Sequence, residues 1–96
     1  MVSTELNLSD HPQIMKRLGE IQGPISLHEN PGIQPVLVAI VEQLLDMGFH
    51  PSGIVSQLVT YFEQRNANRI NAIISVGIVV GESVVARNKQ AAVAER

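Results

Sequence analysis

The sequence predicts a mostly α-helical protein, a small bundle of about four helices with a possible short N-terminal strand. Apolar residues recur at spacings of three and four along several segments, which is the period of an amphipathic helix. Apolar residues make up 45% of the 96 residues but aromatic residues only 3%, so aliphatic side chains must fill the core. There is no cysteine. Close packing or self-association must therefore stabilise so short a chain.

The first two expected elements are an N-terminal arm and a helix. Residues 1–8 alternate between apolar and polar side chains, a strand pattern at a terminus where fraying is common. Residues 9–22 are expected to form a helix, because Ser9 can cap it and Pro12 suits its first turn. Gly23 and the proline after it end this helix.

A loop and two further helices are expected next. Residues 23–35 contain three prolines and two glycines, which indicates a loop. Residues 36–48 form a helix that is apolar on most sides, which predicts burial on most sides. Residues 51–65 form an ordinary amphipathic helix, with an apolar stripe opposite a polar one.

The last helix is expected over residues 68–90, although its segment from Ile70 to Val85 has two interpretations. Its many β-branched residues favour a strand, and its two glycines weaken a helix by up to about 1 kcal/mol each. The length without turn residues from Asn68 to Val80 favours a helix. We therefore expect a helix and keep the strand as the alternative.

The whole chain, residues 1–96, is expected to be one cytoplasmic domain. Its N-terminus is polar and lacks the basic start and apolar run of a signal peptide. The last apolar segment is not expected to span a membrane, because Asn71, Ser75 and Glu82 interrupt it. It also falls short of the roughly 20 apolar residues that a span needs.

No pattern in the sequence predicts catalysis, a cofactor or a metal. His11, His28 and His50 lie far apart at three element boundaries, and no pair has helical ligand spacing. No serine lies in a Gly-x-Ser-x-Gly turn. Glu42 and Asp46 lie four residues apart, which is typical of a solvated helical strip. We therefore expect a protein that is not an enzyme.

One motif indicates close helix packing. Gly77 and Gly81 form Gly-x-x-x-Gly, and on a helix the two glycines share a face that another backbone can approach closely. The partner could be another part of the chain or a second subunit, and both remain open.

The helices also offer more apolar surface than the rest of the chain can cover. We therefore expect a non-enzymatic interaction or assembly module that forms a homodimer or larger assembly, with another protein as a second possible partner. The expected interface residues are Val38, Val41, Leu45, Gly77, Gly81 and Val84.

An alternative rests on Met47-Gly48-Phe49, which resembles the first loop of ubiquitin-associated domains, where a Met-Gly-Phe turn follows the first helix. The similarity extends over about residues 36–75, with apolar residues of the next two helices at Ile54, Val55, Leu58, Ile70, Ile73 and Ile74. Gln57 departs from the small alanine usual in that family, and the connection after the second helix is about two residues longer. The resemblance implies that Met47, Gly48, Phe49 and the end of the third helix bind ubiquitin.

A second alternative is a dimeric DNA-binding regulator of the ribbon-helix-helix type. A strand over residues 2–8 followed by helices at 10–22 and 36–47 resembles that family, although the loop between the helices is too long. The outward strand residues would be Ser3 and its alternating neighbours, none of them basic. Residues 1–50 carry two basic and six acidic side chains, a net of −4, whereas residues 51–96 carry a net of +2. The acidic half opposes phosphate binding, so nucleic acid is not expected as a partner.

Overall fold

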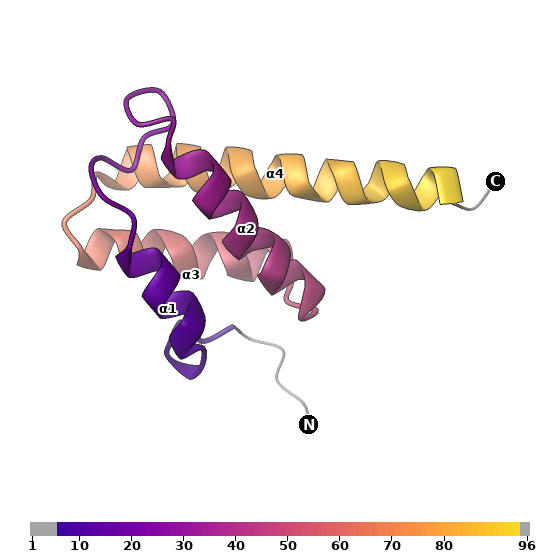
Figure 1. Cartoon of the computed structure of the whole chain (residues 1–96), viewed down its shortest axis with the longest axis horizontal. Coiled ribbons are helices and arrows are strands. Elements are labelled where there is room, and N and C mark those ends of the chain that lie inside the picture. Colours follow the sequence, from indigo (N-terminus) through magenta and orange to yellow (C-terminus); the bar gives the residue numbers. More distant parts are fainter. Residues whose placement is uncertain (1–5, 95–96) are drawn as a thin grey trace.

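The computed structural model describes residues 6–94 and is a small helical bundle (Figure 1). A short 3-10 turn, η1 (Leu8–Asp10), precedes four helices, which are α1 (Pro12–Gly19), α2 (Ile33–Asp46), α3 (Pro51–Gln64) and α4 (Arg69–Ala94). This confirms the predicted mostly helical class. Residues 6–94 contain no strand, so the strand alternative for Ile70 to Val85 was wrong. The possible N-terminal strand lies mainly on residues 1–5, outside the described residues.

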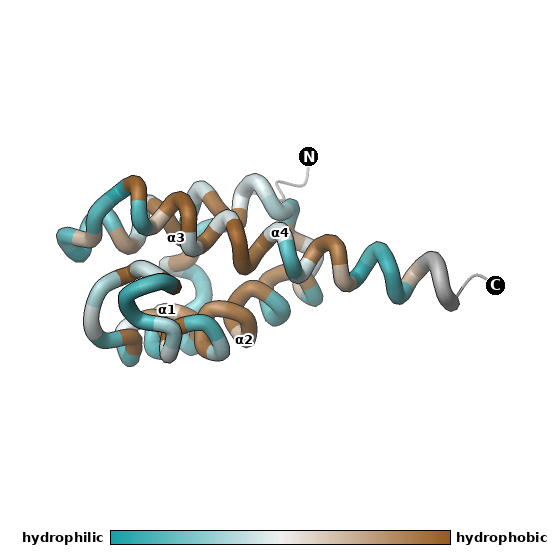
Figure 2. The backbone as a smooth tube through the Cα atoms, turned by 90° about the horizontal axis from the view of Figure 1, so that it is seen from above, coloured by the Kyte–Doolittle hydropathy of each residue, from teal (hydrophilic) through white to brown (hydrophobic). Residues whose placement is uncertain are grey.

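The helices pack around an antiparallel pair. α3 and α4 lie side by side in opposite directions and share the most extensive contact between any two helices (Figure 1). α2 crosses this pair and contacts α4 more than α3, and α1 packs against α2. The C-terminal part of α4 extends beyond the other helices, and there the colour changes from mostly brown to mostly teal (Figure 2).

Helix ends account for most differences from the expected boundaries. α2 begins at Ile33 rather than residue 36, because Pro35 lies in its first turn, where a missing N–H costs nothing. α1 ends at Gly19 and α4 continues to Ala94.

Two helices end in the same type of turn. Gly48, with φ 94°, follows α2, and the N–H of Phe49 bonds the carbonyl of Leu44 at 3.2 Å. Asn66, with φ 65°, follows α3, where the N–H of Ala67 bonds the carbonyl of Phe62 at 3.0 Å. Both are Schellman turns, which need a residue that tolerates a left-handed backbone.

One aliphatic core joins all four helices. Its fully buried side chains include Leu18 of α1, Leu44 of α2, Leu58 of α3 and Val76 of α4. Phe62 is the one aromatic ring among the buried hydrophobic side chains of the described residues. Leu6 and Leu8 close the end of the core from the N-terminal segment. The core thus relies on interlocking aliphatic chains, as the composition predicted.

Candidate interaction surface on the last helix

α4 has one buried face and one apolar face that no other part of residues 6–94 covers. The buried face packs on α2 and α3 through small and β-branched residues, namely Ala72, Ser75, Val76, Val79, Val80 and Ser83. On the other side, four isoleucines and a valine are 43–67% exposed. We call this the exposed face of α4; it comprises Ile70, Ile73, Ile74, Gly77, Ile78, Gly81 and Val85.

Gly77 and Gly81 lie in the middle of the exposed face. A Cβ atom added at either glycine would meet nothing within 4 Å, apart from the helix itself. Within residues 6–94, therefore, no other segment packs closely on this pair of glycines. The glycines form a shallow saddle between isoleucine side chains, open to solvent.

The structure separates the expected interface residues into two groups. Gly77 and Gly81 are exposed, whereas Val41 is 0% exposed in the core, so Val41 was wrong as a surface residue. The remaining three, Val38, Leu45 and Val84, are half-buried and pack against the core.

Sequence reasoning missed the exposed isoleucines of α4. The helix is apolar nearly all round, so its covered and uncovered sides have the same composition. The signal that could have found them is spacing from the glycines: Ile70, Ile74, Ile78 and Val85 lie seven, three or four residues from Gly77 or Gly81.

A loop borders the first half of the exposed face. Between this loop and Ile74 and Ile78 lies a groove of about 320 Å³, lined on the loop side by residues 26–29. Ser75 holds the loop, because its Oγ accepts the N–H of Leu27 at 3.1 Å and donates to the carbonyl of Ile25 at 3.4 Å. The groove is therefore a built feature of the fold.

Ion pairs join α4 to the end of α2. Arg87 Nη2 lies 2.8 Å from Asp46 Oδ1 and also contacts Glu42 through the carboxylate and the main-chain carbonyl. Hydrogen bonds to Asp46 and then to Glu42 raise the pKa of Arg87 above its usual value. The guanidinium stays charged at every pH at which the protein is folded. This cluster places the end of α2 beside the last third of α4.

The residues of the ubiquitin-associated resemblance are only partly available. Met47 is exposed, and Gly48 forms the turn already described. The ring of Phe49 is half-buried and packs edge-on against His11, with ring centroids 5.5 Å apart. The Arg87 ion pairs bring this turn close to α4, but to its last third rather than to the exposed isoleucines.

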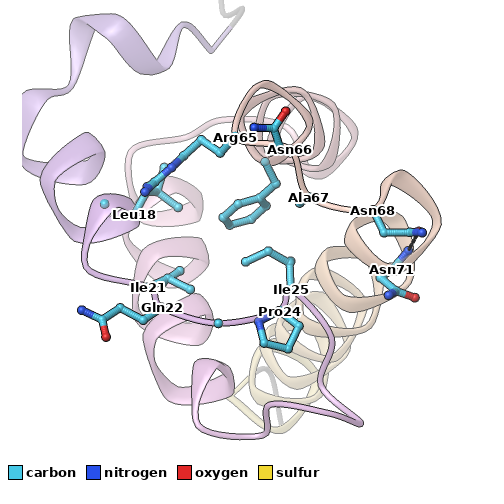
Figure 3. Close-up of a pocket in the computed structure, with 13 residues that line it drawn as sticks. Leu18, Ile21, Gln22, Pro24, Ile25, Arg65, Asn66, Ala67, Asn68 and Asn71 are labelled. Atoms are coloured by element: carbon cyan, nitrogen blue, oxygen red, sulfur yellow. Dashed lines mark hydrogen bonds between the residues drawn. The ribbon is translucent and has the colours of Figure 1, made fainter.

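A second hollow, of about 590 Å³, lies between the end of α1, the loop after it and the connection from α3 to α4 (Figure 3). Leu18, Ile21 and Ile25 line its apolar side, and the rim consists of amides and one cation. Several rim groups already have partners in the chain. Arg65 Nη1 donates to Tyr61 Oη at 2.9 Å, and Asn68 Oδ1 caps α4 at the N–H of Asn71, 3.1 Å away. This rim therefore stabilises the turn between two helices.

Two of the three histidines have contacts within the chain. His50 Nδ1 accepts the N–H of Ser52 at 3.2 Å and so caps α3, and His11 packs on Phe49. Among residues 6–94, no three histidine, aspartate or glutamate side chains gather in a way that could hold a metal ion. The comparisons bring no further guide to the site: no known protein family, curated protein or solved structure matches the chain.

α4 also has the length and composition of a membrane span. Over Arg69–Ala91, 23 residues, it is long and apolar enough to cross a membrane by length and composition alone. Its length alone does not exclude a span, and the expectation that the segment does not cross a membrane stays a prediction. One-third of its most apolar window is nevertheless buried within the bundle.

Proposed function

We propose that this protein is a non-enzymatic assembly module that forms homodimers through the exposed face of α4. The observation that carries the proposal is that face itself: five exposed large aliphatic side chains on one side of the helix, with two glycines among them. Contiguous exposed apolar patches larger than a few hundred Å² mark interaction sites. Covering them removes apolar surface from water at about 25 cal/mol per Å².

A second copy of this chain fits the face because the face is self-complementary. Two-fold dimers use the same patch on both subunits. Here the same patch offers both the saddle at Gly77 and Gly81 and the flanking isoleucines that can fill the saddle of a second copy. Without Cβ atoms at the crossing point, two such helices can approach closely enough for the isoleucines to interlock.

The buried side of α4 favours a protein partner over a lipid bilayer. A spanning α4 would have to leave its packing on α2 and α3, and Ser75 would lose its bonds to Ile25 and Leu27. Pairing on the exposed face leaves all of these contacts in place. The proposal keeps the expectation of a cytoplasmic protein.

The test is the absolute mass in solution, measured by size exclusion with light scattering over a concentration series at low and high salt. We expect twice 10.5 kDa at both salts, because apolar contacts are not screened. Ile74→Glu should give a monomer. Met47→Glu is the matched control, because Met47 is 49% exposed and Ile74 is 53% exposed, but Met47 lies off the face.

Three outcomes would overturn the proposal. One is a wild-type monomer at every concentration. Another is dissociation by Met47→Glu as complete as that by Ile74→Glu. The third is sedimentation of the wild type, but not of Ile74→Glu, with phosphatidylcholine vesicles, which would assign the face to lipid.

A further inference from the structure

We infer that the two α4 helices of the dimer pair antiparallel and cross at Gly77 and Gly81. This inference rests on the proposed function and names the arrangement of the partner on the same surface. Three independent observations support it: the sequence order along the face, the position of the loop, and the charges that flank the groove.

The order of small and β-branched residues along the exposed face is similar in both directions from residue 79. In an antiparallel pair centred there, Gly77 of one copy meets Gly81 of the second copy. Ile73 then faces Val84, which is half-buried beside the face, and Ile74 faces Val85, because the members of each pair lie on the same side of the helix. Small residues therefore pair with small ones at the crossing, and β-branched residues pair with each other on both sides of it.

The loop favours the antiparallel direction for steric reasons. It rises beside the first half of α4, while the C-terminal part of α4 extends past the bundle with no loop beside it (Figure 1). A parallel pair would place two loops and two bundles at the same end. An antiparallel pair places each loop beside the second half of the other α4, where there is space.

The charges along the groove complement each other in the antiparallel arrangement. The loop exposes His28 and Glu29 next to Ile78. Glu82 and Lys89, also exposed, lie four and eleven residues after Ile78 and so share its side of the helix. Antiparallel two-fold pairing brings the same side of both helices together in reversed order. The loop of one copy, with Glu29, then lies beside the part of the other α4 that carries Glu82 and Lys89, and Lys89 is the cation there that can pair with Glu29.

The direction can be measured with spin labels, because the chain has no native cysteine. Gln90→Cys takes one label per chain at an exposed position, and residue 90 lies across the helix from Ile74. Residue 90 is eleven residues from the centre of the pair. At 1.5 Å per residue, two labels in an antiparallel dimer are about 33 Å apart along the axis, whereas in a parallel dimer this axial separation is near zero.

The outcomes separate this inference from the proposed function. Pulsed electron resonance should show a single long distance for Gln90→Cys in a sample whose mass is that of a dimer. A distance of only about two helix widths, roughly 20 Å, in such a dimer would overturn the antiparallel arrangement and leave self-association intact. A monomeric mass would overturn the proposed function itself.

A charge exchange tests the same arrangement without labels. Lys89→Glu should raise the dissociation constant by about fivefold at low salt, because two exposed ion pairs per dimer are lost. Glu29→Lys in the same chain should restore it. Lys16→Glu, at an exposed position of α1, is the control for the change in net charge. If Glu29→Lys does not restore the dissociation constant of Lys89→Glu, the loop of one copy does not face α4 of the other.

Discussion

Ser75 on α4 accepts a hydrogen bond from the main-chain N–H of Leu27 across 48 residues, at 3.1 Å. The same hydroxyl donates to the carbonyl of Ile25, so one side chain pairs a donor and an acceptor of the loop. Asn30 closes the loop from the other side, because its Nδ2 donates to the carbonyls of Gln22 and Pro24 at 2.7 and 3.2 Å. The wall of the groove beside the exposed face thus depends on Ser75 and Asn30, together with Ser26, whose Oγ accepts the N–H of Glu29 at 3.3 Å.

The first prediction concerns that serine. Ser75→Ala should lower the free energy of unfolding by about 1–3 kcal/mol, because it leaves the N–H of Leu27 and the carbonyl of Ile25 without partners in a part-buried position. Urea unfolding followed by circular dichroism measures the change. Ser56→Ala, at an exposed position of α3, is the control and should change it by less than about 0.5 kcal/mol. Equal effects of the two variants would show that the loop does not depend on Ser75.

The second prediction separates folding from association at Gly77. The sequence alone led us to expect that Gly77→Leu disrupts folding or association, and the open space around the glycine assigns the effect to association. Gly77→Ala should raise the stability of the monomer by up to about 1 kcal/mol through better helix propensity. Both variants should weaken the dimer, Gly77→Leu more strongly.

Thermal unfolding at a concentration below the dissociation constant and sedimentation velocity above it give the two readouts for these glycine variants. A folded Gly77→Leu protein with undiminished association would rule out a close crossing at this glycine.

The third prediction concerns the two helix-ending turns. Asn66→Gly should raise the free energy of unfolding by up to about 1 kcal/mol, because glycine adopts φ 65° without strain. Gly48→Ala should lower it by about 1 kcal/mol, although a Cβ there meets no atom within 4 Å. Urea unfolding of both variants measures the two changes in the free energy of unfolding, which should have opposite signs. Changes of the same sign would refute the backbone explanation.

The fourth prediction concerns Arg87. Arg87→Met should lower the melting temperature, because it leaves Glu42 and Asp46 side by side without their cation. Arg87→Lys should lower it less, since a lysine keeps the positive charge that Nη2 of Arg87 places between both carboxylates, although as a more strongly hydrated point charge. Scanning calorimetry measures the three melting temperatures, which should fall from the wild type to Arg87→Lys to Arg87→Met. Because Asp46 is largely exposed, the loss should shrink in 0.5 M salt, and a loss that grows with salt would contradict an ionic origin.

The sequence predicted the helices better than their outward faces. The helix α3 was expected at residues 51–65 and lies at Pro51–Gln64, because Pro51 starts it and a clean apolar stripe runs along it. The start of α2 was wrong, since a proline in a first turn resembles a proline in a loop. Helical period alone could not say which side of α4 is covered, because both sides are apolar. Helical period also could not predict the hydrogen bond between Ser75 and Leu27, because tertiary packing sets that contact.

The short connection between α3 and α4 has a consequence for the order of folding. Only residues 65–68 separate two helices that share the most extensive contact in the bundle. Closing so short a chain segment costs little entropy, so we expect this hairpin to form in the transition state, and α1 with its long following loop to dock afterwards. Val76→Ala should then slow refolding, whereas Leu18→Ala should chiefly speed unfolding, and stopped-flow kinetics in urea would show the reverse if α1 nucleates the bundle. A nascent chain would accordingly stay open at its N-terminal end until its last helix has formed.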